Sequence, residues 1–264
     1  MRLTHAITLS LLLAATAAHA TDTAGLAAAR RGLYAAVTAG SAPELRKARD
    51  AFALLQANDA ASPDLAYWLA LADWRLVPVL ADSNKATAKQ LCKEGIAACD
   101  QAVAARPNFA DAVALKAGLQ GMALMFLSSQ AAMSLGAEME EAYGRASGLE
   151  PANPRVLLLK GINVLHKPKE VGGGPDKARP VFERAVAAFA KAAPGDSTAI
   201  DWGRDDALVW SGICASRLGD WAAARACFQQ VLEKNPAHAW TRYVLLPEAE
   251  KKLAAKATPA AETK

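Results

Sequence analysis

Residues 207–240, ALVWSGICASRLGDWAAARACFQQVLEKNPAHAW, decide the fold of this chain. Apolar residues recur at helical spacing on both sides of Gly219, and Asn235 and Pro236 end the second run. Such a pattern predicts two antiparallel helices joined by a tight turn, because glycine and proline interrupt regular structure at these points.

Small and aromatic residues stand at fixed positions in the second of these helices, and one glycine of the first helix belongs to the same pattern, here called the register. The register positions are Gly212, Ala224, Phe228, Val231 and Pro236, and the last four follow one another at steps of four, three and five residues. These steps put small and aromatic side chains on one helix face, where a neighbouring helix packs closely.

Three earlier stretches repeat the register. They are Gly95, Cys99, Ala102 and Pro107; then Met139, Tyr143, Ala146 and Pro151, with Gly161 ten residues further on; then Ala178, Phe182 and Ala185, closed late by Pro194. The closing prolines lie 44, 43 and 42 residues apart, so the chain is predicted to be a helical repeat array. Because Met139 stands where the other units have a small residue, we expect that helix pair to be splayed.

The register resembles the tetratricopeptide repeat (TPR). This resemblance implies an all-α fold, a right-handed superhelical solenoid of antiparallel helix pairs, whose usual task is to hold a partner. Within residues 150–246, the stretches NPRVLLLKG, HKPKEVGGGPDKARPVFERA and DWGRDD also resemble secreted bacterial TPR-like proteins with a glycine-rich inserted loop. The repeat period here exceeds the TPR period of about 34 residues, so longer helices or loops are expected.

The first twenty residues have the pattern of a secretory signal peptide. Arg2 precedes an apolar run, and Ala18-His19-Ala20 forms a small-x-small cleavage site, so cleavage is expected after Ala20. The apolar run is shorter than the roughly 20 residues that a membrane span requires. We therefore expect a periplasmic or secreted protein without stable membrane insertion.

The rest of the chain divides by its patterns into four parts. We expect an N-terminal capping helix pair in residues 21–60, about four TPR-like hairpins in 61–240, a C-terminal capping helix in 241–256 and a disordered tail in 257–264. The formal net charge of +4 is too small to indicate a nucleic-acid partner. The oligomeric state is left open.

Four cysteines, Cys92, Cys99, Cys214 and Cys227, leave two alternatives open. Export permits disulfides, and Cys214 and Cys227 lie on the two facing helices of residues 207–240, so a bridge between them is conceivable. Cysteine is also a common small core residue, which favours buried free thiols instead. Cys92 and Cys99 lie about 10 Å apart along one helix, which is too far for a disulfide.

Sequence signals for chemistry are weak. Gly172-Gly173-Gly174 is better interpreted as a turn than as a phosphate loop, since Pro175 removes a donor and no strand precedes it. Methionines at 122, 125, 133 and 139 suit core packing better than a copper site. Catalytic motifs are missing from the sequence, so we expect a non-catalytic protein with no cofactor and no metal. Trp202-Gly203 has two possible roles. It either covers one end of a groove or packs locally at the start of a helix, and we favour the local packing.

In TPR hairpins the first helix of each pair lines a concave groove. Carried onto this chain, the resemblance predicts a partner-binding groove with five polar residues: Asp111, Arg155, His166, Asp206 and Arg217. Arginine suits a carboxylate or an acidic peptide because its guanidinium pairs two oxygens at once. Ordinary solvated helix faces are the alternative for each of them.

Two functions therefore remain open. The first is a scaffold that binds a protein or peptide partner in an open groove. The second is an accessory ligand-handling subunit of a periplasmic solute-uptake system of the TRAP type, which predicts an enclosed pocket with convergent polar groups.

Overall fold

The computed structural model describes residues 22–192 and 200–257, and every regular element within them is a helix. The α-helices in chain order are α1 (Thr23–Ala39), α2 (Ala42–Asn58), α3 (Pro63–Leu80), α4 (Lys85–Ala105), α5 (Ala110–Ala123), α6 (Ser129–Leu149), α7 (Pro154–His166), α8 (Pro175–Lys191), α9 (Arg204–Arg217), α10 (Trp221–Lys234) and α11 (Leu246–Ala257). Short 3₁₀ turns cover Leu124–Phe126 and Lys169–Val171, and a π-helical turn, Thr241–Leu245, precedes α11.

Local sequence fixes where these helices begin. Ser62, Asn84 and Asp220 stand at N-caps, and their side chains accept hydrogen bonds from backbone N–H groups three residues later, which the first turn of a helix leaves unpaired. Pro63 and Pro154 occupy first turns, where the missing N–H costs no intrahelical bond.

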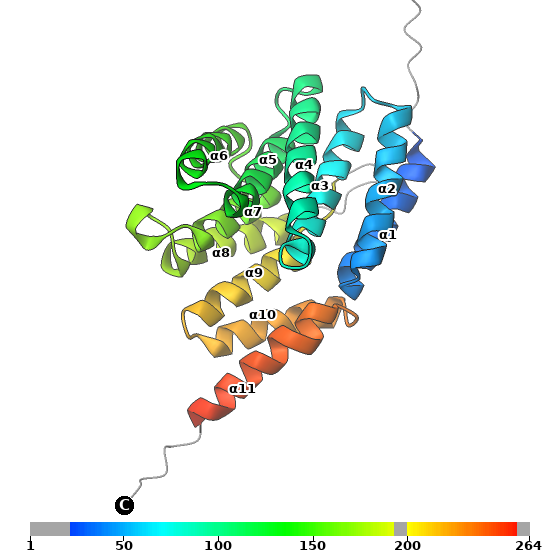
Figure 1. The fold of residues 1–264 in the computed structure, drawn as a ribbon. Coiled ribbons are helices and arrows are strands. Elements are labelled where there is room, and N and C mark those ends of the chain that lie inside the picture. Colours follow the sequence, from blue (N-terminus) through cyan, green and yellow to red (C-terminus); the bar gives the residue numbers. More distant parts are fainter. Residues whose placement is uncertain (1–21, 193–199, 258–264) are drawn as a thin grey trace, which may run out of the picture.

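Consecutive helices pack as hairpins that follow one another along a curve (Figure 1). The odd-numbered helices α1, α3, α5, α7 and α9 also contact one another in sequence and form an inner layer, which the even-numbered helices cover from outside. These contacts confirm the predicted all-α solenoid of helix pairs.

Glycines set the closest helix approaches. A β-carbon built on Gly212 would overlap the ring of Phe228, and one on Gly161 would lie 2.7 Å from the ring of Phe182. The glycine and aromatic positions of the predicted register thus interlock across α9–α10 and α7–α8. Phe182 and Phe228 are almost fully buried as a result.

The expectation of a splayed pair at Met139 is wrong. Helices α5 and α6 form one of the most extensive helix contacts of the fold, and Met139 is 5% exposed. Gly121 on α5 makes room for it, because a β-carbon there would lie 3.2 Å from the Met139 sulfur. In this pair the large residue, Met139, stands on the second helix and the small one, Gly121, on the first.

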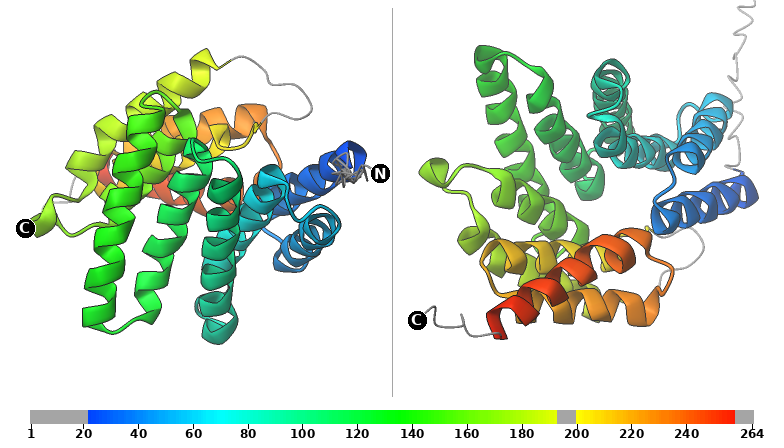
Figure 2. Two further views of the ribbon diagram at one scale, coloured as in Figure 1. Left: turned by 90° about the horizontal axis from the view of Figure 1, so that it is seen from above. Right: turned by 60° about the horizontal axis from the view of Figure 1, so that its bottom comes forward.

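The two ends of the solenoid meet. Asn235, after α10, donates a hydrogen bond of 3.1 Å to the Thr38 hydroxyl near the end of α1. A β-carbon on Gly40 would lie 3.9 Å from that of Ala239. Figure 2 shows the end of α1, in blue, beside the start of the α11 region, in orange.

Several predictions fall partly or wholly beyond these helices. The signal peptide (1–20), Pro194 and residues 258–264 of the expected tail lie outside the described residues, and the division into cap and hairpins stays a prediction. Helix α11 continues to Ala257, one residue past the expected end of the C-terminal helix.

None of the described helices is long and apolar enough to cross a bilayer. All four cysteines are free thiols, so the bridge between Cys214 and Cys227 is not formed.

Candidate functional site

The N-terminal half of the inner face is occupied by the chain itself. Residues 200–203, here called the inner segment, lead into α9 and cross to α3. Trp202 is buried, its indole N–H donates to the Tyr67 hydroxyl at 2.7 Å, and its ring lies 5.9 Å from that of Trp74. Trp202 therefore packs against α3, more than 120 residues earlier in the chain, and the favoured interpretation of a purely local contact is wrong.

Polar contacts hold the inner segment at both sides of Trp202. The Asp201 carboxylate accepts from Arg30 at 2.7 Å and from the Tyr34 hydroxyl, both on α1. Arg155 on α7 donates to the Ile200 carbonyl at 3.0 Å. The inner segment, which carries an acidic and an aromatic residue, is thus bound to three helices of the inner layer.

Two of the predicted groove residues, Asp111 and Arg155, pair with each other beneath this segment. Their side chains are only 8% and 16% exposed, and Asn153 donates a further hydrogen bond of 2.9 Å to Asp111. This ion pair joins α5 to α7 and is not available to a partner in this arrangement.

A third predicted residue, Asp206, is bound by an arginine that the sequence analysis did not single out. Both terminal nitrogens of Arg75 donate to the Asp206 carboxylate at 2.6 Å, which is the bidentate geometry of a strong ion pair. The Arg75 guanidinium also lies 4.8 Å from the Trp74 ring and 5.3 Å from the Trp202 ring. This contact links α3 to α9 across the solenoid.

The remaining two, His166 and Arg217, come together at the C-terminal end of the inner face with two tryptophans. The ring of Trp210 on α9 lies 5.5 Å from the His166 ring and 6.4 Å from the Trp240 ring, edge to face in both cases. Arg217 lies 3.1 Å from His166 Nε2. We call His166, Trp210, Arg217 and Trp240 the aromatic–arginine site.

Hydrogen bonds define the protonation state of this histidine. Nδ1 faces the Ile162 carbonyl at 2.9 Å and must donate, so Nε2 of a neutral ring accepts from Arg217. Partial desolvation lowers the pKa of His166, and the Arg217 charge lowers it further. The imidazole is therefore neutral at pH 7, and Arg217 carries the only positive charge of the His166–Arg217 pair.

The aromatic–arginine site is open to solvent. Trp240 is 45% exposed, His166 and Arg217 are exposed, and Trp210 is partly buried. Arg217 also lines an open depression of about 210 Å³ between α9, α10 and α11. An exposed indole beside a guanidinium can hold an apolar or flat group together with a carboxylate.

Spacing on α9 contained a signal for this site. Trp210 and Arg217 lie seven residues apart, so they share one helix face, and Asp206, four residues before Trp210, lies on the same face. Trp240 and Arg75 carried no comparable signal, because they reach the inner face from outside α9, and Arg75 lies on α3, far away in sequence.

The other candidate motifs serve structure. Gly174 N–H donates to the Val164 carbonyl at 2.8 Å and Gly173 N–H to the Pro168 carbonyl at 3.0 Å, so the glycine-rich loop is a closed turn. Within residues 22–192 and 200–257, no group of three or more His, Cys, Asp and Glu side chains is arranged to hold a metal ion.

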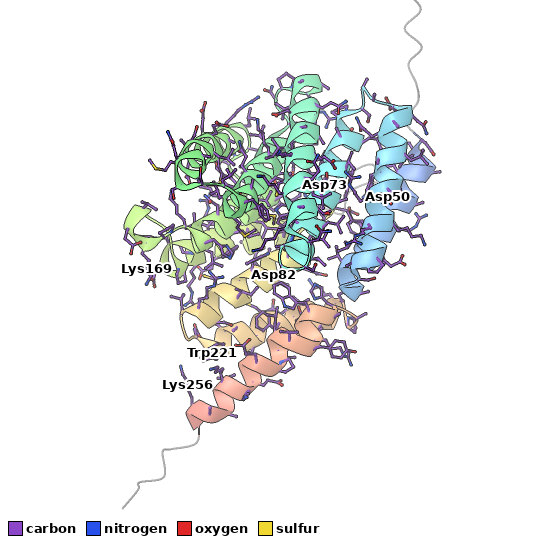
Figure 3. All side chains as sticks on the ribbon, in the orientation of Figure 1. Asp50, Asp73, Asp82, Lys169, Trp221 and Lys256 are labelled. Atoms are coloured by element: carbon purple, nitrogen blue, oxygen red, sulfur yellow. The ribbon has the colours of Figure 1, made fainter. Side chains whose placement is uncertain are left out.

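A second open depression, of about 520 Å³, lies on the outer side between α2, α3 and α4. Arg49 lines this depression and binds Asp73, which is labelled between α4 and α2 in Figure 3. This fully buried carboxylate accepts from Arg49 at 2.7 Å, and Arg49 also binds Glu94. Burial raises the pKa of Asp73 to about 7 despite Arg49, and the Glu94 charge raises it further.

This raised pKa predicts a pH-dependent stability. Because the folded state holds the Asp73 proton more tightly than the unfolded state, the free energy of unfolding should decrease as the pH rises from about 4 to 7. Asp73→Asn, which cannot titrate, should remove most of that slope in urea unfolding curves. Asp82→Asn, at an exposed position just after α3, is the control, and an unchanged slope in Asp73→Asn would contradict the assignment.

Comparisons with known proteins agree with this architecture. A family model described as tetratricopeptide repeat matches residues 206–238. No curated protein sequence matches the chain. Among solved structures, the HusA haemophore from Porphyromonas gingivalis is similar over 72% of this chain and 92% of its own, with a TM-score of 0.56 and 24% identity.

A thermophilic TPR protein from Thermus thermophilus is similar over 86% of this chain and 99% of its own, with a TM-score of 0.58 and 14% identity. At these identities the likeness concerns the fold alone. Residues 206–238 match the tetratricopeptide repeat model, and the chain as a whole has a TPR-like helical solenoid fold.

Proposed function

We propose that this protein is a non-catalytic scaffold that binds a protein or peptide partner at the inner face of its solenoid. The observation that carries the proposal is the aromatic–arginine site. Trp210 and Trp240 offer apolar ring surface, and Arg217 offers donors to a carboxylate, at the end of the inner face that the inner segment leaves open.

The inner segment indicates what kind of peptide the inner layer accommodates. Asp201 and Trp202 supply one carboxylate and one indole. These groups bind an arginine and two tyrosine hydroxyls of α1 and α3. The aromatic–arginine site repeats this combination of a cation and aromatic rings in exposed form. A partner with an acidic residue beside an aromatic or large apolar one fits it best.

The proposed setting is the periplasm or the extracellular space, on the basis of the signal-peptide pattern in residues 1–20. The solute-uptake alternative needs an enclosed pocket, whereas the two depressions described above are open, so it ranks below the scaffold.

Co-purification from a periplasmic extract tests the scaffold. The mature chain should retain a stoichiometric protein, and Trp210→Ala combined with Trp240→Ala should weaken its retention at least about tenfold, since buried tryptophans dominate binding energies. Leu54→Ala, at a 66% exposed position on α2, is the matched control and should retain the partner. Retention that survives the double substitution would contradict binding at this site.

A second candidate ligand is a flat porphyrin. It is favoured by the rings of Trp210 and Trp240, on which a flat macrocycle can stack, and by the similarity to a haemophore; iron ligation by His166 would require its Nε2 atom to leave Arg217. Titration of the same purified chain with haemin distinguishes the two: a saturable absorbance change that His166→Ala abolishes would support the porphyrin, and the absence of any change would leave the peptide partner alone.

A further inference from the structure

The hairpin between α5 and α6 ends in an uncharged tip. No Asp, Glu, Lys or Arg occurs between Lys116 and Glu138, and we call residues 117–137 the apolar tip. The corresponding turns of the neighbouring hairpins are charged, with Asp82 and Lys85 after α3 and with Lys167, Lys169 and Glu170 after α7. Figure 3 marks two of these turns by Asp82 and Lys169.

Large apolar side chains on this tip face solvent. Met125 and Met133 are 63% and 77% exposed. Five further residues there are only partly buried, namely Met122, Leu124, Phe126, Leu127 and Leu135. Contiguous exposed apolar residues on a soluble domain mark an interaction surface.

Helix α4 brings positive charge beside this tip. Lys116 on α5 donates to Asp100 on α4 at 2.5 Å, so the face of α4 that carries Asp100 is turned toward α5. Lys93 lies two helical turns before Asp100 and Lys89 one turn earlier, which places both on that face. Both lysines are exposed.

The antiparallel course of α4 and α5 sets the height of these lysines. A β-carbon on Gly95 would lie 2.9 Å from Leu119, so the first turns of α4 lie beside the last turns of α5. Figure 2 (left) shows the α5–α6 hairpin, in green, ending at the lower margin next to one end of α4, in teal. Lys89 and Lys93 thus flank the base of the apolar tip.

The acidic residues near the apolar tip do not cancel the positive charge of Lys89 and Lys93. Glu138 is nine residues from the start of α6, or about 13 Å along the helix axis. An interfacial segment reaches roughly 5–10 Å into a bilayer, so Glu138 would stay in water. Glu94 is paired with Arg49 toward α2, and Asp82 in the preceding turn is outnumbered by the two lysines.

We propose that the apolar tip inserts into the interface of an anionic phospholipid bilayer, while Lys89 and Lys93 contact the lipid phosphates. Flexible methionines suit irregular acyl packing, and lysines at the rim place their charge at the headgroups while their stems stay apolar. Such binding is peripheral and reversible, because only a few side chains enter the bilayer.

Vesicle co-sedimentation of the mature chain tests this. The protein should bind vesicles of phosphatidylcholine mixed with phosphatidylglycerol more strongly than vesicles of phosphatidylcholine alone, and added salt should weaken the binding. Met125→Glu with Met133→Glu should reduce binding at least about tenfold. Lys89→Glu with Lys93→Glu should reduce it by at least about fivefold per lysine on the anionic vesicles.

Leu54→Glu is the matched control for each methionine substitution, because it adds one carboxylate at a comparably exposed apolar position on α2, away from the tip. It should bind as the parent chain does. All variants replace exposed residues, and circular dichroism melting curves check that they fold. Failure of the parent chain to sediment, or unchanged binding of the methionine variant, would overturn the proposal.

A concentration-dependent dimer that the methionine variant abolishes would also overturn it, since the tip would then be covered by a second copy. Retention of a partner at the aromatic–arginine site is measured separately with Trp210→Ala and Trp240→Ala. The two proposals therefore fail independently.

Discussion

Replacing Arg155 with methionine is expected to lower the free energy of unfolding by about 3–5 kcal/mol, because the buried Asp111 carboxylate loses its charged partner. Both side chains are largely inaccessible to water, at 16% and 8% exposed, so solvent cannot replace the lost interaction. The substitution also removes the donor to the Ile200 carbonyl, which loosens the inner segment. Urea unfolding followed by circular dichroism measures the effect.

A second substitution separates charge burial from packing. Asp111→Asn in the Arg155→Met background removes the stranded charge and keeps the bond from Asn153, so much of the lost stability should return. Arg225→Met, at an exposed position on α10, should change the free energy of unfolding by less than about 0.5 kcal/mol. Equal losses in the single and the double variant would contradict the buried ion pair.

Phe228→Ala should cost about 3–5 kcal/mol of unfolding free energy, because it empties the contact between α9 and α10. Gly212→Ala alone should also destabilise the fold, by about 1–3 kcal/mol, since the new β-carbon would overlap the Phe228 ring. In the double variant the ring is absent, so the two losses should not add.

The matched control for the glycine is Gly144→Ala on α6. A β-carbon there meets no atom within 4 Å, so the same substitution should stabilise the helix by about 0.5–1 kcal/mol. Additive losses at Gly212 and Phe228 in thermal or urea unfolding would show that the glycine and the ring do not interlock.

The hairpins were predictable because their determinants are local. Register glycines, N-caps and closing prolines act within one or two helices; α4, for example, begins at Lys85 directly after its N-cap residue Asn84. Met139 was misjudged for the same reason: its compensating glycine, Gly121, lies on the other helix and outside the repeating register.

The inner face was predictable only in part. The TPR resemblance selected Asp111, Arg155, His166, Asp206 and Arg217, and the structure places them in three contacts: Asp111 with Arg155, Asp206 with Arg75, and His166 with Arg217. The partner of Asp206 and the position of Trp202 depend on how far the solenoid curves. Curvature accumulates from small rotations between helix pairs, and no short stretch of sequence encodes it.

The contact between Thr38 and Asn235 has a mechanical consequence. An open array of helix pairs behaves as a spring, because each pair touches only its neighbours and small rotations add along its length. Here the hydrogen bond from Asn235 to Thr38, together with the contacts of Asp201 on α1, connects both ends of the spring. These contacts restrain the opening of the inner face, so a partner bound there as proposed would be selected by size as well as by charge.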